Sequence, residues 1–351
     1  MSDKVTIQDI ADALGLSRNT VSKAINNTGV LADSTREKVL KKAVEMGYKQ
    51  FSYIASMPNS ALMGQYSSKK AGEIAVMLGG VVDGSHFATT MLDKFQMEIS
   101  SLGYTMTIHR ISDENRSKKE LPVTFIPDNT KGILCVELFD YEYCKMLTAL
   151  GIPMLMADGP IESFAKGLDV DMLLMNNTNC IFEIIAKLKL QGITKIGFVG
   201  EMNHCRSFFE RYAAFRDAMY LCGLSINEDY NLTQVHAHGP EYPEHLFKAL
   251  SKMKELPELF ICANDFVAID LLQGLKKMNK SCPDDVLICG FDDSPESRFI
   301  TPALTTCHIH SQILGFSAAQ LLISRINQPD LNYRTLYAET DLIIRESTAI
   351  K

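Results

Sequence analysis

Hydrophobic positions near the start of the chain recur at the spacing of α-helices. In residues 7–14 the apolar residues fall at i, i+3, i+4 and i+7, which places them on one helix face. Thr6 stands where an N-cap is expected, and Gly15 supplies a tight turn before Ser17, a second N-cap. The next helix turns three apolar residues inward, namely Val21, Ala24 and Ile25. The pattern predicts two helices joined by a glycine turn, with a polar outer face on the second.

That polar face carries side chains that can read DNA. Two helices joined in this way are typical of the helix-turn-helix motif, whose second helix enters the major groove. Arg can donate twice to guanine, Asn can pair with adenine and Lys is a further donor, and these roles are open to Arg18, Asn19 and Lys23. Hydroxyl groups suit phosphate oxygens, and those available are Thr6, Ser17, Thr20 and Ser22. A solvated helix pair in another small α-domain is the alternative.

From residue 73 the pattern changes to short apolar runs that alternate with amphipathic helices. The predicted strands are 73–78, 104–110, 132–138, 153–158, 195–200, 258–264 and 286–291. The predicted helices are 87–102, 140–150, 178–191, 206–223, 242–255 and 266–279. Alternation of this kind indicates parallel sheets covered on both faces. Because the strands fall into two consecutive sets, we expect two doubly wound α/β lobes, with a ligand cleft beyond the carboxyl ends of their strands.

Composition and charge narrow the class of protein. A chain of 351 residues with 46% hydrophobic and 22% charged residues is typical of a globular protein of two or three domains. No apolar run is long enough for a transmembrane span, and the start has no signal-like segment. Nine cysteines without a CxxC pair indicate reduced thiols and a cytoplasmic protein. Residues 1–60 hold eight Lys and Arg against six acids, although the whole chain has a net charge of −7.

Two parts of the chain resemble the LacI/GalR family of transcription regulators. VTIQDIADALGLSRNTVSKAINN and TREKVLKKAVEMGY are similar to that family's DNA-binding head. FICANDFVAIDLLQGLKKM and CPDDVLICGFDDSPESRFITPALTT are similar to its effector domain, which has the periplasmic sugar-binding-protein fold. The resemblance therefore implies a small all-α helix-turn-helix head followed by two doubly wound parallel α/β lobes.

The resemblance also implies domain boundaries. The head would occupy residues 1–57, a linker 58–72, and the effector-binding and dimerisation domain 73–351. The chain would cross between the lobes near 160–170, 293–296 and 328. Asn26 is also expected to contact the DNA. In the family, a hinge helix inserts a Leu into the minor groove of the operator. Met57 occupies the position of that Leu and could act as an apolar wedge between base pairs. The alternative is that this segment is only a flexible tether.

Candidate effector-binding residues follow from the family motifs. Arg211 corresponds to the Arg of an R-x-x-G-F segment, Asp265 to the Asp of C-A-N-D, and Asp158 to the acid that ends the fourth strand. An Arg–Asp set can bind vicinal hydroxyls or a carboxylate. Phe87 is a candidate for stacking on the ligand, and Phe291 is a candidate for the wall of the cleft or, as an alternative, for support of the hinge between the lobes. The alternatives are that Asp265 caps a helix, that Arg211 forms a surface ion pair, and that Phe87 belongs to the core.

The function implied is that of a homodimeric repressor that binds a near-palindromic double-stranded DNA operator. Its effector would be a sugar or sugar derivative bound between the lobes; control by a protein partner is the alternative. No cofactor, membrane or catalytic role is expected, since the chain lacks G-x-S-x-G, P-loop, H-E-x-x-H and G-x-G-x-x-G motifs. Two histidine groups resemble metal sites only weakly, and we expect no metal there: His236, His238 and His245, and Cys307, His308 and His310.

Overall fold

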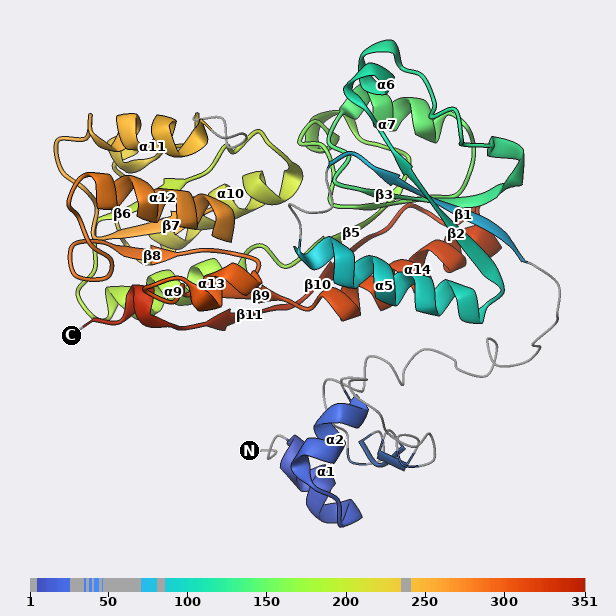
Figure 1. Cartoon of the computed structure of the whole chain (residues 1–351), viewed down its shortest axis with the longest axis horizontal. Coiled ribbons are helices and arrows are strands. Elements are labelled where there is room, and N and C mark those ends of the chain that lie inside the picture. Colours follow the sequence, from blue (N-terminus) through green and yellow to red (C-terminus); the bar gives the residue numbers. More distant parts are fainter. Residues whose placement is uncertain are drawn as a thin grey trace. The chain divides into compact units, whose positions relative to one another are not determined.

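The structure is a computed structural model of a chain that forms two compact units, Met1–Ser68 and Lys69–Lys351 (Figure 1). It describes residues 5–25, 35, 38, 39, 41–43, 46, 71–80, 86–234 and 241–350, without the side chains of residues 86 and 87. The hinge helix expected at Met57, and nearly all of the expected linker 58–72, lie outside the described residues. The two units are therefore taken in turn.

The first unit, the head, contains the predicted helix pair, α1 (Ile7–Leu14) and α2 (Arg18–Ile25). Thr6 begins α1 with a capping box, in which its hydroxyl accepts from the Asp9 N–H and the Asp9 carboxylate accepts from the Thr6 N–H. Gly15 ends the helix at φ +63°, a left-handed conformation that glycine adopts without cost. The hydroxyl of Ser17 accepts from the Thr20 N–H at 3.0 Å. Both predicted caps and the predicted turn are confirmed.

The head has a small apolar core of its own. Residues 38, 39 and 41–43 are helical, in agreement with the third helix that the family resemblance implies. The side chains buried together come from all three helical segments: Ile10, Ala11, Val21, Ala24, Val39 and Ala43. The inner face predicted for α2 is therefore confirmed at Val21 and Ala24, which leaves its polar face outward.

The first lobe of the body is built on a six-stranded parallel sheet with the order β10-β5-β4-β3-β1-β2. Its strands are β1 (Gly72–Leu78), β2 (Tyr104–Arg110), β3 (Thr130–Val136), β4 (Met154–Ala157), β5 (Asp171–Met175) and β10 (Thr335–Ala338). Alternate side chains of β1 enter different cores, Ile74 and Val76 on one face and Ala75 and Met77 on the other. Burial on both faces explains why the inner strands β1, β3, β4 and β5 are mostly apolar, whereas the edge strands β2 and β10 also carry polar residues.

Helices cover both faces of this sheet. One face packs against α5 (His86–Ser101) and α14 (Ser311–Asn327), and the other packs against α7 (Tyr141–Thr148). Two shorter helices lie in the loops, α6 (Asp113–Lys118) and α8 (Ser163–Lys166). The described part of the body also contains three 3-10 turns, η2 (Pro127–Asn129), η3 (Glu228–Tyr230) and η4 (Glu346–Thr348).

The second lobe repeats the arrangement on a smaller sheet with the order β6-β7-β8. These parallel strands are β6 (Ile196–Val199), β7 (Leu259–Cys262) and β8 (Leu287–Cys289). One face packs against α9 (Asn179–Lys189) and α10 (Arg206–Leu221), and the other against α11 (Tyr242–Leu250) and α12 (Asp265–Lys277). The predicted fold class, two doubly wound parallel lobes behind an all-α head, is confirmed.

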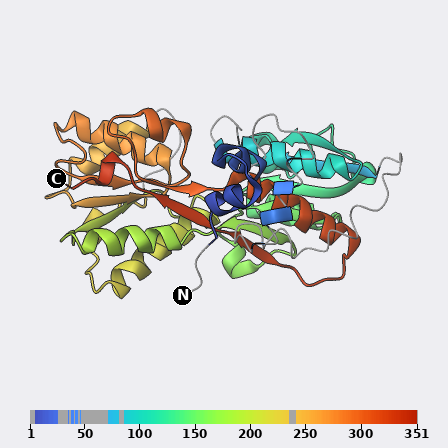
Figure 2. The ribbon, with the colours of Figure 1, turned by 90° about the horizontal axis from the view of Figure 1, so that it is seen from below.

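The chain passes between the lobes at different points from those expected. The first passage is residues 176–178, between β5 and α9. The others are an antiparallel ribbon of β9 (Thr306–Ile309) and β11 (Thr340–Ile343), which runs between the two lobes (Figure 2). Figure 1 labels α13 (Pro295–Phe299) next to this ribbon. The expected positions near 160–170, 293–296 and 328 are each too early. The first and third passages come later because β5, α14 and β10, which the strand and helix pattern missed, belong to the first lobe. The second comes later because the chain stays beside β8 in the second lobe as far as Thr305.

None of the described helices is long and apolar enough to cross a membrane.

Candidate functional site

A cavity of about 730 Å³ lies between the two lobes of the body. Its walls come from segments that follow the carboxyl ends of strands in both lobes, which is where parallel α/β sheets bind ligands. The lining residues from the first lobe include Gly79, Glu137, Phe139, Asp140 and Asp158. Those from the second lobe include His204, Ser207, Phe208, Arg211, Asn264, Phe266, Asp270 and Asp292. A volume of this size suits a ligand as large as a mono- or disaccharide.

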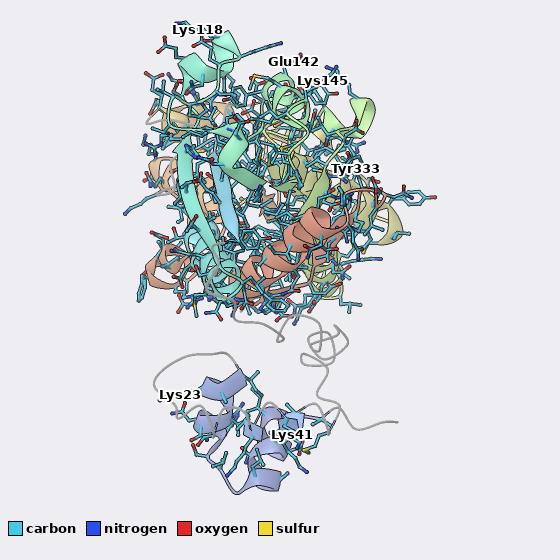
Figure 3. All side chains as sticks on the ribbon, turned by 90° about the vertical axis from the view of Figure 1, so that its right-hand side faces the viewer. Lys23, Lys41, Lys118, Glu142, Lys145 and Tyr333 are labelled. Atoms are coloured by element: carbon cyan, nitrogen blue, oxygen red, sulfur yellow. The ribbon has the colours of Figure 1, made fainter. Side chains whose placement is uncertain are left out.

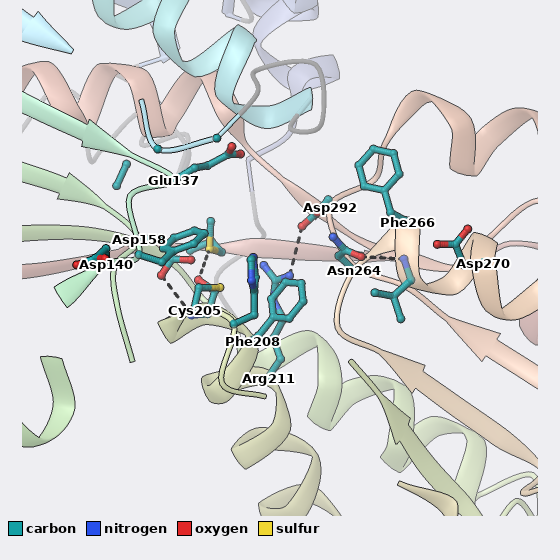
Figure 4. A pocket seen from close by; sticks show the side chains of 18 of the residues that line it. Glu137, Asp140, Asp158, Cys205, Phe208, Arg211, Asn264, Phe266, Asp270 and Asp292 are labelled. Atoms are coloured by element: carbon teal, nitrogen blue, oxygen red, sulfur yellow. Dashed lines mark hydrogen bonds and ion pairs between the residues drawn. The ribbon is translucent and has the colours of Figure 1, made fainter. Parts of the chain in front are cut away.

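Figure 4 shows how the labelled side chains divide between the walls. Asp140, Glu137 and Asp158 lie on one side, and Asn264, Phe266 and Asp270 lie on the other. Three side chains lie between these groups: Phe208, Arg211 and Asp292. A ligand in the cavity would therefore contact both lobes at once.

Arg211 lines the cavity as predicted, but it is a buried residue and not part of a surface ion pair. Only 3% of it is exposed. Its Nε donates to the side-chain oxygen of Asn177 at 2.9 Å, and its Nη1 donates to the carbonyl of Ala263 at 2.6 Å. The same Nη1 lies 3.4 Å from a carboxylate oxygen of Asp292. Arg211 thus joins the first passage between the lobes to the ends of β7 and β8.

Phe291 lies behind this arginine instead of lining the cavity. The ring centroid of Phe291 is 3.6 Å from the guanidinium carbon of Arg211, and only 1% of Phe291 is exposed. Cation–π stacking of this kind fixes the plane of the guanidinium group. The expectation that Phe291 touches the effector is therefore replaced by a supporting position, and the next residue, Asp292, lines the cavity.

Asp158 lines the cavity as predicted and also connects the two lobes. Its Oδ1 accepts from the N–H of Gly159 at 2.7 Å and from the N–H of Ser207, in the first turn of α10, at 3.2 Å. The Arg206 N–H donates to the Gly159 carbonyl at 2.9 Å. Burial raises the pKa of Asp158, although these N–H donors oppose the rise. Asp158 therefore lines the cavity and also links the end of β4 in the first lobe to the start of α10 in the second.

Asp265 does not line the cavity, which corrects its expected role. It is fully buried at the start of α12, where its carboxylate accepts from the Ser294 N–H at 2.7 Å and from the Thr306 hydroxyl at 2.6 Å. Nor does it cap the helix, because the N-cap is Asn264, whose side chain accepts from the Val267 N–H. Burial and the nearby charge of Asp292 raise the pKa of Asp265 to about 8.

Replacing Asp265 by Asn is expected to change how stability depends on pH. Between about pH 4 and pH 8 folded Asp265 holds a proton that the unfolded chain has lost, so its contribution to the free energy of unfolding falls as pH rises, by about 1 kcal/mol per pH unit. Asn reproduces the protonated form, since its amide can donate to Thr306 while its carbonyl accepts from Ser294.

Urea unfolding at pH 6 and pH 8 measures this effect. The free energy of unfolding of Asp265→Asn should rise relative to the wild type by about 1 kcal/mol or more between the two pH values. Parallel pH profiles for the two proteins would show that Asp265 is already ionised in the folded state.

Several cavity residues were not predicted. The main ones are Glu137, Phe139, Asp140, His204, Phe208, Phe266 and Asp270. Three of them form a row of rings: the centroids of Phe139 and His204 are 5.1 Å apart, and those of His204 and Phe208 are 5.0 Å apart. The signal that could have identified the others is their position within a few residues of a strand's carboxyl end. Phe87 begins α5, but its side chain lies outside the described residues.

The candidate DNA-reading residues of the head share one exposed face. Arg18, Asn19 and Lys23 are exposed on α2, and Figure 3 shows Lys23 at the surface of the head. The candidate phosphate contacts Thr6 and Ser17 are also exposed, whereas Thr20 and Ser22 are half-buried. Asn26 lies outside the described residues, as does Met57.

Segments of both units match models of known protein families. Residues 6–50 match the family model of bacterial regulatory proteins of the lacI family, and residues 185–348 match that of the periplasmic binding protein-like domain. The chain is 26% identical to the HTH-type transcriptional regulator GalR of Lacticaseibacillus casei, over 98% of this chain and 99% of that protein. It is 27% identical to the HTH-type transcriptional repressor PurR of Haemophilus influenzae (strain PittEE), over 97% and 98%.

Solved structures share the fold. The transcriptional regulator CelR in complex with cellobiose has a TM-score of 0.68 at 20% identity and covers 98% of this chain and 99% of its own. The lac repressor dimer bound to operator and the anti-inducer ONPF has a TM-score of 0.63 at 17% identity, covering 99% and 100%. The two family models stand in order along the chain, and the relatives, which are transcriptional regulators and not enzymes, match it from end to end. The chain belongs to the LacI/GalR family of DNA-binding transcription regulators.

Proposed function

We propose that this protein is a transcriptional repressor whose affinity for operator DNA is set by a sugar or sugar derivative bound between the lobes. The observation that carries the proposal is the cavity, whose polar and aromatic lining comes from both lobes. Relatives support it: PurR is named a repressor, CelR was solved with cellobiose, and a LacI family regulator from Enterococcus faecium was solved with bound ribose. A sugar needs both buried polar groups and an apolar face, and this lining offers both.

The head reads the operator through α2. Arg18, Asn19 and Lys23 contact base edges in the major groove, because their side chains are long or amide-bearing donors on an exposed face. The hydroxyl-bearing residues contact phosphates: Thr6, Ser17, Thr20 and Ser22. Asn26 and Met57, outside the described residues, complete the proposed interface, with Met57 as the wedge in the minor groove.

The protein acts as a homodimer on a near-palindromic operator. A twofold assembly presents two heads to two half-sites, so the symmetry of the DNA matches that of the protein. The solved lac repressor is a dimer on its operator, which supports this arrangement. All nine cysteines are free thiols, which fits a cytoplasmic protein.

Control by the effector follows from how the lobes are joined. Asp158 and Gly159 of the first lobe are hydrogen-bonded to the start of α10 in the second. A ligand that binds both walls favours one separation of the lobes, and therefore one arrangement of these contacts. The first lobe changes its orientation in the dimer as a result. Because the head is joined to the body at β1 of that lobe, the spacing of the two heads changes with it.

Replacing Arg18 by Ala tests the proposed reading of the operator. Fragmented genomic DNA selected on the purified full chain supplies the operator, and fluorescence anisotropy measures its affinity. Loss of a two-donor contact to guanine should weaken binding by about 1–3 kcal/mol and relax the preference at one base pair of each half-site.

Arg110→Ala is the matched control, since Arg110 is an exposed arginine of the body. It should leave operator affinity unchanged. If Arg18→Ala weakens binding to all sequences equally, Arg18 contacts a phosphate and its assignment as a base-reading residue is wrong.

A further inference from the structure

The described residues that line the cavity carry an excess of negative charge. Two are basic, Arg116 and Arg211, and five are acidic: Glu137, Asp140, Asp158, Asp270 and Asp292. Charges in a partly enclosed cavity interact more strongly than they do in water. The excess of carboxylates therefore favours a positively charged ligand over a negatively charged one.

Each of the two arginines already has an acidic partner of its own. Arg116 forms an ion pair with Asp113, outside the cavity lining, and donates to the Gly79 carbonyl at 2.8 Å. Arg211 is paired with Asp292 at 3.4 Å, and its Nε and Nη1 donate to neutral acceptors. Both positive charges are therefore already compensated inside the protein.

Three of the acids form no ion pair with any described residue, although the charge of Arg211 acts on Asp158 and opposes the rise of its pKa. Asp140 accepts from the Tyr143 N–H at 2.8 Å, and Asp158 accepts from two N–H groups, but all these donors are neutral. Asp270 forms no hydrogen bond or ion pair with any described residue, and burial raises its pKa. A half-buried carboxylate without a partner loses hydration that a bound cation would replace.

Aromatic rings lie beside these carboxylates on both walls. Phe266 precedes Asp270 by one turn of α12, which places the two side chains on the same helix face (Figure 4). On the opposite wall Phe139 comes directly before Asp140 and begins the row of rings with His204. A carboxylate beside an aromatic face suits an ammonium group, through an ion pair and a cation–π contact. The rings also suit the apolar face of a sugar.

We propose that the effector is a cationic sugar derivative: an amino sugar whose ammonium group is held by Asp270 beside Phe266. This inference rests on the proposed function, because it takes the cavity to be the effector site. The excess of carboxylates over free cations excludes acidic sugars, whose charge would be repelled by Asp140, Asp158 and Asp270 together. A neutral sugar would fill the volume but leave Asp270 without a partner.

Titration calorimetry on the full chain tests the charge of the ligand directly. The probes are two matched series: D-glucosamine, N-acetyl-D-glucosamine and D-glucose, and D-galactosamine, N-acetyl-D-galactosamine and D-galactose. Within each series the ring is constant and only the substituent at carbon 2 changes, from an ammonium to an acetamido or a hydroxyl group, so that the amine alone is charged. At least one amine should bind, at least tenfold more tightly than its acetylated and hydroxyl counterparts. Equal binding across a series, or no binding by either amine, would overturn the proposal.

Two variants locate the ammonium group. Asp270→Asn keeps the size of the side chain and should weaken binding of the amine at least tenfold while changing that of the neutral sugar less than twofold. Asp217→Asn, at an exposed aspartate of α10, is the matched control and should change neither. Unchanged amine affinity in Asp270→Asn would overturn the assignment of Asp270.

A measurement of operator binding with the same preparation distinguishes a wrong effector assignment from a wrong proposed function. If the chain binds its selected operator and a neutral sugar binds as tightly as the amine, the charge of the effector is wrong and the proposed function stands. If the chain selects no operator sequence, the proposed function fails and the effector assignment falls with it.

Discussion

Replacing Asp171 by Asn is expected to lower the free energy of unfolding of the body by about 3 kcal/mol or more. Asp171 is fully buried and binds two arginines: its carboxylate accepts from Arg325 at 2.8 and 3.1 Å and from Arg334 at 2.7 Å. It also accepts from the Arg334 N–H at 2.8 Å. Burial alone would raise the pKa of Asp171, but the arginines outweigh it and hold that pKa below its usual range.

The cost is large because Asn leaves a buried positive charge without compensation. Arg325 is only 3% exposed, and its other partners are backbone carbonyls, which carry no formal charge. The Asn amide group would also place N–H donors against N–H donors. Since Asp171 begins β5 and Arg334 comes directly before β10, the substitution loosens the pairing that anchors the returning strand to the first lobe.

Urea unfolding followed by circular dichroism at 222 nm measures this loss, since the chain has no Trp to report by fluorescence. Glu114→Gln is the control, because it breaks an ion pair with Lys118 in which both side chains are exposed. The control should change stability by about 0.5 kcal/mol or less. A similarly small effect of Asp171→Asn would mean that the buried charges contribute nothing net to stability.

Local signals in the sequence were sufficient to predict the head and most of the sheet strands. Thr6, Gly15 and Ser17 are residue types with strong positional preferences, so the caps and turn of α1 and α2 were predictable. β1 and β2 have seven residues each; β1 is mostly apolar, and β2 alternates apolar and polar residues, so both patterns predicted strands. In these places local preference and tertiary structure agree.

The passages between the lobes could not be predicted in the same way. β5 is only five residues long, and β9, β10 and β11 are four residues each. Strands of similar length, such as β6 and β7, were predicted because they are wholly apolar, whereas β9, β10 and β11 mix polar and apolar residues and their pairing is decided by contacts with residues far away in the sequence. The return of β10 to the first sheet depends on Asp171, more than 150 residues earlier.

The side chains that line the cavity could likewise be predicted only in part. Asp158 and Arg211 were placed correctly, whereas Asp265 and Phe291 each lie one residue from a side chain that does line the cavity. Near a strand end successive side chains point in different directions, so a motif fixes the segment but not which side chain faces the ligand. Asn264, Phe266 and Asp292 occupy the lining positions.

Replacing Arg211 by Ala is expected to remove the effector's influence on DNA binding. The substitution leaves the Asn177 side chain, the Ala263 carbonyl and Asp292 without their shared donor, so the wall of the cavity between the lobes is lost. Arg211→Lys should recover the response only in part, because a single ammonium group cannot serve three acceptors in this geometry. Operator affinity without ligand should stay within about twofold of the wild type, as the head is a separate unit.

The coupling of operator and ligand in the wild-type protein tests the central claim most directly. Anisotropy titration of the selected operator should be carried out with and without a saturating concentration of the sugar that binds most tightly. We predict a change in operator affinity of about fivefold or more, and by linkage the operator must change the affinity for the sugar by the same factor. An operator affinity that is the same with the cavity empty and with the cavity filled would contradict the account.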